Sequence, residues 1–302
     1  MKVASRPAEA RAGSAGPAGR QGPGGADLAR GRVVDRLIVA ALLLGGVIML
    51  LPFAWMFSTS WRLAKDSFSL PPEWWPTTWH VENYREVLEN IPFVAFVLNS
   101  LLVTVLITLG QLVTCSMAAY AFARLRFPGR EVLFLVFLSQ LMVPQQVTII
   151  PVFVLIRIFG LLDTHWALIV PALFSAFGTF LLRQFFLTIP NELEDAARVD
   201  GAGYVRTFVQ IILPLAGPAL ATLTIFTFNF YWNEFFRPLL FISTWERMTL
   251  PLGLTIMKGF LGVGNVAAIM AGVSMGILPV LVVFLLAQRY LIEGVTLTGM
   301  KG

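Results

Sequence analysis

Cysteine, histidine and lysine are scarce in this sequence, and each scarcity excludes a kind of site. Cys115 is the single cysteine, so no disulfide can form within the chain. The two histidines, His80 and His165, are far apart and have no metal-binding partners, so zinc or haem ligation is not expected. None of the four lysines, at positions 2, 65, 258 and 301, stands in a Gly-x-x-x-x-Gly-Lys-Ser/Thr motif. We therefore expect no metal, no cofactor and no nucleotide-binding loop.

Charged residues are also few, at 13% of 302 residues, against roughly a quarter in a soluble domain. Hydrophobic residues make up 57%, and the mean hydropathy is +0.77. The run Leu37–Phe57 holds no charge and, at about 1.5 Å per residue, reaches the roughly 30 Å of a bilayer's hydrocarbon core. The net charge of +5 does not predict nucleic-acid binding, because in a membrane protein the placement of basic residues decides their meaning.

Long apolar runs predict an all-α, polytopic membrane protein with six transmembrane helices. They lie at about 37–58, 93–119, 131–157, 165–187, 212–241 and 266–290. Pro144 and Pro151 are expected to split the third span, Pro171 lies in the fourth and Pro279 in the sixth. Proline inside a span indicates a packing kink more often than a pathway. Residues 1–32, rich in Ala, Gly, Pro and Arg, are predicted to be a disordered tail, and residues 33–302 a single membrane domain.

The positions of lysine and arginine predict the orientation of the spans. With the N-terminus inside, most of the 22 basic residues fall in the inner segments. We therefore expect both termini to be cytoplasmic. The segments 59–92 and 242–265 then face outwards, and the loop between the fourth and fifth spans faces inwards.

That inner loop carries the most informative pattern in the chain. Pro190 ends the preceding span, and Asn191 with Glu194 has the spacing of a capping box. The spacing of Leu193, Ala196, Ala197 and Asp200 predicts one narrow helix face of mostly small side chains. Gly201 can adopt a positive φ and end the helix. Because two helical turns are marginally stable alone, this helix is expected to dock into a groove on a partner.

The loop resembles the EAA loop of ABC importer permeases. It has Asp195-Ala196-Ala197, then Gly201, nine residues, and Ile211-Ile-Leu-Pro214. Asp195 stands where glutamate is usual, which keeps the charge and loses one methylene. The runs Glu82-Asn-Tyr84, Trp232–Phe235, Thr249–Gly253, Gln288–Tyr290 and Gly299–Gly302 are similar to the carbohydrate branch, the maltose-transporter G-type permeases. The resemblance covers about 33–302.

This resemblance implies a type I ABC importer permease of the cell membrane, which is not itself an enzyme. It implies a second, homologous permease, two cytoplasmic ATPase subunits, an extracytoplasmic solute-binding protein and a carbohydrate substrate. Within the inner loop, the residues implied to couple to the ATPase are Glu194, Asp195, Ala196, Ala197, Asp200, Gly201 and Ala202. The segment 241–265 resembles the family's outer loop that contacts the binding protein; a surface or re-entrant loop is the alternative.

Polar residues inside the spans are the candidate pathway, because burial in lipid is costly. We single out Asn99, Gln140, Asn229 and Asn233. Gln111, Gln145, Gln146 and Glu234 share this property. Hydrogen bonding between helices is the more common reason for any one of them, and Glu234 can also form a salt bridge with Arg237.

Other functions remain open on the sequence alone. The same architecture could import glycerol phosphate, a polyol or a peptide. An intramembrane enzyme would need a histidine or paired aspartates deep in a span, and the sequence has neither. A proton-coupled carrier would need ionisable relays and repeated halves, for which Glu234 alone is thin support. The sequence does not name the solute.

Overall fold

The computed structural model describes residues 25–67, 74–260 and 265–299. It divides into two units, residues 1–54 and 55–302, which we describe separately. Residues 1–24 of the predicted tail and the chain's last three residues lie outside the described part. Residues 25–32, also predicted to belong to the tail, form the start of helix α1. The division of the chain at position 32 stays a prediction.

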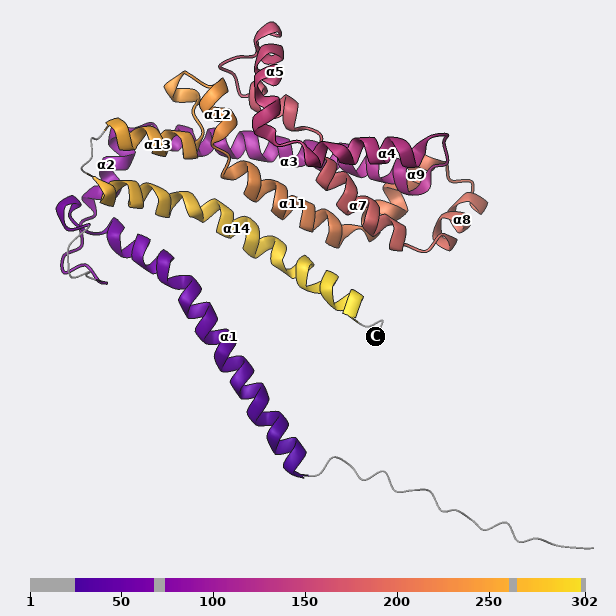
Figure 1. Ribbon diagram of the computed structural model, residues 1–302, viewed down its shortest axis with the longest axis horizontal. Helices are drawn as coiled ribbons and strands as arrows, with labels where there is room; N and C mark the ends of the chain where they lie inside the picture. The colour runs from indigo at the N-terminus through magenta and orange to yellow at the C-terminus, as the bar shows by residue number, and fades with distance from the viewer. Residues whose placement is uncertain (1–24, 68–73, 261–264, 300–302) are drawn as a thin grey trace, which may run out of the picture. The chain divides into compact units, whose positions relative to one another are not determined.

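The described residues form helices and no strand, as the sequence predicts. The long helices are α1 (Gly25–Ser60), α3 (Phe93–Arg124), α11 (Gly217–Trp232) and α14 (Val266–Gly299). The shorter ones are α2 (Glu82–Asn90), α4 (Arg130–Ser139), α5 (Gln145–Ile158), α6 (Trp166–Ile169), α7 (Ala176–Thr188), α8 (Glu192–Val199), α9 (Tyr204–Thr207), α10 (Leu213–Leu215), α12 (Phe236–Phe241) and α13 (Leu250–Phe260). Figure 1 shows their arrangement.

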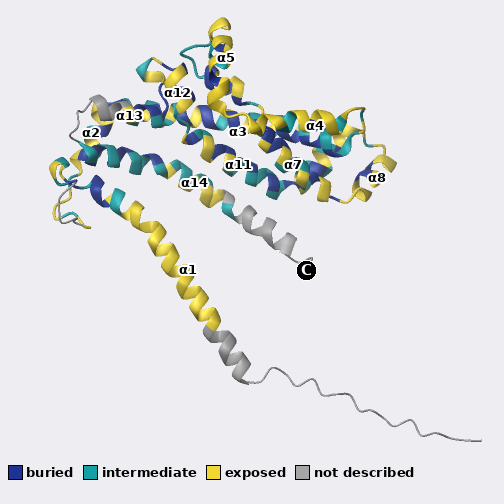
Figure 2. Ribbon diagram, viewed as in Figure 1, coloured by how far each residue is buried: buried dark blue, intermediate teal, exposed yellow. Residues whose placement is uncertain are grey.

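The first unit contains most of α1, which carries no charged residue from Leu37 onwards. Residues 34–54 are all exposed, as the yellow ribbon in Figure 2 shows. A helix without a polar face suits a lipid environment rather than water. Together with residues up to Ser60 it is long and apolar enough to span a bilayer.

In the second unit, α3 is the central helix, and α7 and α11 pack along it. One buried cluster, including Phe96, Ile107 and Leu168, surrounds its first half. Another, including Cys115 and Phe186, surrounds its second half. In Figure 1, α2 and α13 lie near one end of this unit, and α8 lies near the other. Many large apolar side chains of these helices remain exposed.

Four helical segments of the described chain are long and apolar enough to cross a membrane on their own, and two bent pairs bring the total to as many as six. The predicted third span is bent by 101° between α4 and α5. Pro144 accounts for the bend: it lacks an N–H, and it holds Val143 in an extended conformation. The fifth span is also bent, by 76°, before Gly217.

The predicted end of the fifth span, at position 241, is wrong. Helix α11 stops at Trp232, and residues 236–241 form the separate helix α12. Between them, Glu234 turns towards the Arg237 guanidinium and forms a buried, bidentate ion pair with it. A buried charge requires such a partner, so the chain turns to provide one.

Candidate functional site

Helix α8 begins with three acidic residues and ends with Arg198, an order that suits the helix dipole. Gly201 follows at a φ of 78°, as the sequence predicts. No atom lies within 4 Å of where its Cβ would be, so backbone conformation, not space, requires glycine there. The helix is therefore short and sharply terminated.

The predicted capping box at Asn191 and Glu194 is wrong. Neither side chain caps α8; both instead contact Arg124, the last residue of α3. The Arg124 Nε lies 2.9 Å from a Glu194 carboxylate oxygen, and both side chains are at least 93% buried. The guanidinium also donates to the Asn191 Oδ1 and to the carbonyls of Phe186 and Ile189. Because a buried cation must be paired, it takes the groups that would have capped the helix.

The result is a helix anchored on one side and free on the other. Glu194 and Ala197 face the protein and are buried. Leu193, Ala196 and Val199 are exposed, Val199 at 88%. The predicted face is therefore divided, with Ala197 turned inwards. Asp195 and Asp200 are also exposed, and Asp195 pairs only with Arg198 on the same helix.

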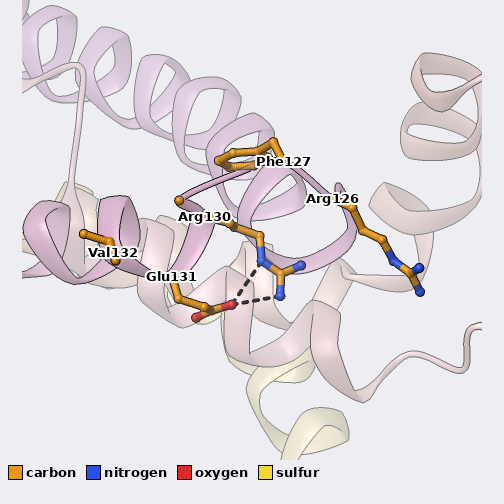
Figure 3. Close-up of a pocket in the computed structure, with 6 residues that line it drawn as sticks. Arg126, Phe127, Arg130, Glu131 and Val132 are labelled. Atoms are coloured by element: carbon orange, nitrogen blue, oxygen red, sulfur yellow. Dashed lines mark hydrogen bonds and ion pairs between the residues drawn. The ribbon is translucent and has the colours of Figure 1, made fainter.

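The start of α4 adds a second anchor at this end of the unit. Arg130 donates two hydrogen bonds to the neighbouring Glu131, whereas Arg126 points away from them (Figure 3). Glu131 also pairs with Arg183 of α7 at 3.2 Å. The Arg183 guanidinium lies 4.2 Å from the centre of the Phe134 ring. These contacts join α4 to α7, so we interpret the pocket in Figure 3 as structural.

A cavity of about 800 Å³ lies further along the unit, where several helices are broken. Its wall includes the bend between α4 and α5, the turn before α7 and the last turns of α11. Irregular backbone at membrane depth occurs where it lines a cavity or is buried in protein. The volume falls in the roughly 300–1,000 Å³ range of small-molecule sites.

The structure brings two of the four predicted pathway residues together. Gln140 and Asn229 both line the large cavity. Asn99 instead donates to the carbonyls of Glu246 and Met248, at 2.7 and 3.0 Å. Asn233 lines a separate pocket of about 440 Å³ and donates to the Asn229 carbonyl at 2.8 Å. Asn99 and Asn233 therefore hydrogen-bond to backbone carbonyls.

Gln111 and Gln145, which the sequence marks as polar, also line the cavity. Sequence reasoning missed Arg124 and Asp163. Arg124 looks like an ordinary inner flanking charge, and only the fold shows its burial. Asp163, in the loop after α5, has a φ of 55° and accepts hydrogen bonds from the backbone N–H groups of Ser243 and Thr244. A lone aspartate in a loop gives no sequence signal for such long-range contacts.

Comparison with known proteins decides the family. The model of the family described as binding-protein-dependent transport system inner membrane component matches residues 111–296. The chain belongs to this family. The resemblance seen in the inner loop is thereby confirmed, and this permease is a transport protein of a family that is not enzymatic.

Relatives match the permease over most of its length. It is 33% identical to the diacetylchitobiose uptake system permease protein DasC of Streptomyces coelicolor, over 90% of this chain and 98% of that one. It is 34% identical to the sn-glycerol-3-phosphate transport system permease protein UgpE of Yersinia pestis, over 87% and 96%. Among solved structures, a bacterial ABC transporter involved in importing the acidic polysaccharide alginate matches with a TM-score of 0.74 and 25% identity, over 86% and 96%.

Proposed function

We propose that this permease forms half of the translocation pathway of an ATP-driven carbohydrate importer. The observation that carries the proposal is the anchored helix α8, which is locked to α3 by the buried Arg124–Glu194 pair and exposes Leu193, Ala196 and Val199. An exposed apolar patch on a rigid support is typical of a protein-binding site. The partner in this role is a separate ATPase subunit.

The coupling residues divide into two groups in this proposal. Asp195, Ala196, Asp200, Gly201 and Ala202 form or shape the surface that meets the ATPase. Glu194 and Ala197 are buried, and they act by holding that surface on the permease. Because α3 runs from α8 towards the opposite end of the unit, a movement of α8 is transmitted along it (Figure 1). Two such permeases, each on one ATPase subunit, enclose the pathway.

Both termini and α8 are placed on the cytoplasmic side in this proposal, and α2 and α13 face the external binding protein. The distribution of basic residues supports this orientation. The carbohydrate class is supported by DasC, whose name specifies diacetylchitobiose. The relative UgpE, named for sn-glycerol 3-phosphate, favours glycerol phosphate as the second candidate solute.

Substitution of Gly201 tests the coupling role. Valine at a φ of 78° costs about 1–2 kcal/mol, which displaces the end of α8 and weakens ATPase binding about tenfold. We expect Gly201→Val to remain in the membrane but to show ATP-dependent uptake and co-purification with the ATPase that are reduced about tenfold. Asparagine tolerates this backbone conformation, so Gly201→Asn is the matched control and should retain both.

Two results would contradict the proposed function. Wild-type uptake by Gly201→Val would remove the basis for a coupling helix. Solute uptake by the purified permease without an ATPase would contradict the importer as a whole. If Gly201→Val fails to insert into the membrane, Ala196→Trp is tested instead. This variant blocks the exposed face of α8 without straining the backbone.

A further inference from the structure

The large cavity is lined by one charged side chain among the described residues, that of Arg237. Its Nε and one terminal nitrogen donate to the two carboxylate oxygens of Glu234. The other terminal nitrogen donates to the Leu168 carbonyl at 3.1 Å. The Arg237 side chain is 5% exposed, so little of the guanidinium surface is available to a solute. The cavity therefore carries no net charge.

Uncharged polar groups are available on the wall instead. Gln140, Gln145 and Asn229 are exposed to the cavity from three different segments. Within the described chain, the carboxamides of Gln140 and Gln145 make no side-chain hydrogen bond, and that of Asn229 accepts only one, from Asn233. Each carboxamide offers both donors and acceptors, which match the hydroxyl groups of a polyol.

Aromatic faces occupy the rest of the wall. Phe174, Phe177, Phe226 and Phe230 line it, and the Phe177 and Phe226 rings meet edge to face at 5.9 Å. The negative face of an aromatic ring attracts the polarised C–H groups of a sugar ring and repels an anion. Carboxamides interleaved with aromatic faces therefore suit a pyranose better than a phosphate.

Hydrogen bonds within the protein hold the wall of the cavity together. Gln111, 2% exposed, donates to the Ala172 carbonyl at 2.7 Å and to the Tyr231 hydroxyl at 3.1 Å. Its Oε1 accepts from the Thr227 hydroxyl at 3.1 Å. These bonds join α3 to α11 and to the turn before α7. They fix the wall without using the carboxamides of Gln140 and Gln145.

We infer that this cavity is a subsite for a neutral, polyhydroxylated solute, and that the Glu234–Arg237 pair excludes solutes bearing a phosphate or carboxylate. The inference rests on the proposed function and deepens it, because it chooses carbohydrate over glycerol phosphate. Glu234 acts as the specificity-determining residue. It neutralises the single cation that would otherwise attract an anion into a low-dielectric site.

Protection of a cavity cysteine tests this inference without the binding protein. Thr148→Cys, at an exposed position of the cavity wall that is not one of the three carboxamides, is introduced into the complete importer in nanodiscs. N-ethylmaleimide labelling of this chain is followed by mass. The native Cys115 is buried and provides a low background. The neutral probes are maltose and N,N′-diacetylchitobiose; the anionic probes are sn-glycerol 3-phosphate and dimannuronate. Thr77→Cys, exposed and away from the cavity, is the control for non-specific effects.

We expect at least one neutral probe to slow labelling at position 148 by about threefold or more, as occupancy at twice the dissociation constant would. The anionic probes should leave the rate unchanged. In Glu234→Gln the Arg237 charge is unpaired. The anionic probes should then slow labelling of the cavity cysteine about threefold. The double variant Glu234→Gln, Arg237→Gln lacks both charges. The anionic probes should again leave its labelling rate unchanged.

Equal protection by anionic and neutral probes in the Thr148→Cys protein would overturn the inference, as would protection by neither class. This test does not depend on the Glu234 variants, so it stands if they fold poorly. The proposed function is tested separately by ATPase co-purification and ATP-dependent uptake in the same preparation. An importer that binds its ATPase and carries an anion would keep the proposed function and lose this inference.

Discussion

Two adjacent carboxylates at the start of α8 have opposite surroundings. Glu194 is 5% exposed and pairs with the buried Arg124, whereas Asp195 is 68% exposed and pairs with Arg198 at 3.3 Å. Removing one partner of a buried pair leaves an uncompensated charge, which costs about 3–5 kcal/mol. An exposed pair contributes about 0.3–0.5 kcal/mol. The two residues therefore have separable roles.

Glu194→Ala should lower the thermal unfolding temperature of the purified permease, because Arg124 loses its carboxylate partner. Asp195→Ala should leave that temperature within about 2 °C of the wild type, given the small contribution of an exposed pair. Intrinsic tryptophan fluorescence during heating measures both. In our proposal, Asp195→Ala still weakens ATPase co-purification because it changes the docking surface. Equal thermal shifts in the two variants would contradict the assigned anchoring role of Glu194.

Asp163 is the residue for which pH dependence can be worked out. The Thr244 hydroxyl, with the backbone N–H groups of Thr244 and Ser243 and the Arg247 charge, lowers the pKa of Asp163 to about 2. Its unfolded pKa is about 3.9, so the folded chain favours the ionised form. The stabilisation is therefore complete above about pH 4 and is lost as the pH falls through about 2.

Asp163→Asn should lower the unfolding temperature at pH 7 by a few degrees, because the amide cannot replace the ionised acceptor. Asparagine also tolerates the φ of 55°, so backbone strain is not a second variable. The difference from the wild type should shrink at pH 3, measured by the same fluorescence assay, because Asp163 of the unfolded wild type is then mostly protonated whereas the folded form is still ionised. A difference that stays constant between pH 7 and pH 3 would show that the charge is not the cause.

At the scale of single elements, hydropathy predicts where apolar helices occur but not where they bend. The second predicted span, 93–119, corresponds to α3 with its end extended to Arg124. The sequence predicts that Pro144 and Pro151 split the third span; the structure breaks the helix at Pro144, whereas Pro151 lies inside α5. The 101° bend depends on neighbouring helices that replace the lost backbone hydrogen bonds, and these neighbours are distant in sequence. For the same reason the cavity at this bend could not be predicted.

The inner loop shows the same division between local and distant determinants. The turn at Gly201 is a local backbone preference, so its positive φ could be predicted from the residue type. The capping box was also a local prediction, but Arg124 arrives from another helix and takes both capping groups. Local patterns therefore predict α8 itself, while its anchoring requires the tertiary structure.

Helix α13 packs on α3 through Gly253. The stability of the permease should therefore depend strongly on the size of the side chain at position 253. A Cβ at Gly253 would lie 2.2 Å from a ring carbon of Phe96, which is fully buried. Gly253→Ala should therefore destabilise the permease by about 1–3 kcal/mol through overpacking. Gly217→Ala is the matched control, because no atom lies within 4 Å of its added Cβ.

Thermal unfolding of both glycine variants measures this effect. Adding Phe96→Leu to Gly253→Ala should recover part of the loss, since a smaller side chain makes room for the new methyl group. If the changes in unfolding temperature caused by Gly253→Ala and Phe96→Leu simply add in the double variant, Gly253 and Phe96 do not share this contact. Because α13 belongs to the segment proposed to face the binding protein, a displaced α13 should also reduce solute uptake.

At the scale of the whole molecule, the proposed mechanism requires α8 and α2 to be on opposite sides of the membrane. They lie at opposite ends of the second unit, to which α3 contributes a helix of 32 residues, long enough to cross a bilayer (Figure 1). Single cysteines at Thr77, before α2, and at Gly203, after α8, mark the two ends. Both positions are exposed, and no atom lies within 4 Å of a Cβ added at Gly203.

A membrane-impermeant maleimide applied to intact cells should label Thr77→Cys and leave Gly203→Cys unlabelled. After the membrane is opened, Gly203→Cys should be labelled as well. This result would show that the cysteine was unlabelled in intact cells because it lies on the inner side. Cys115 is buried, so the wild-type chain is the blank in both conditions. Labelling of Gly203→Cys from outside would place α8 away from any cytoplasmic ATPase, and the buried Arg124–Glu194 anchor would then need a different explanation.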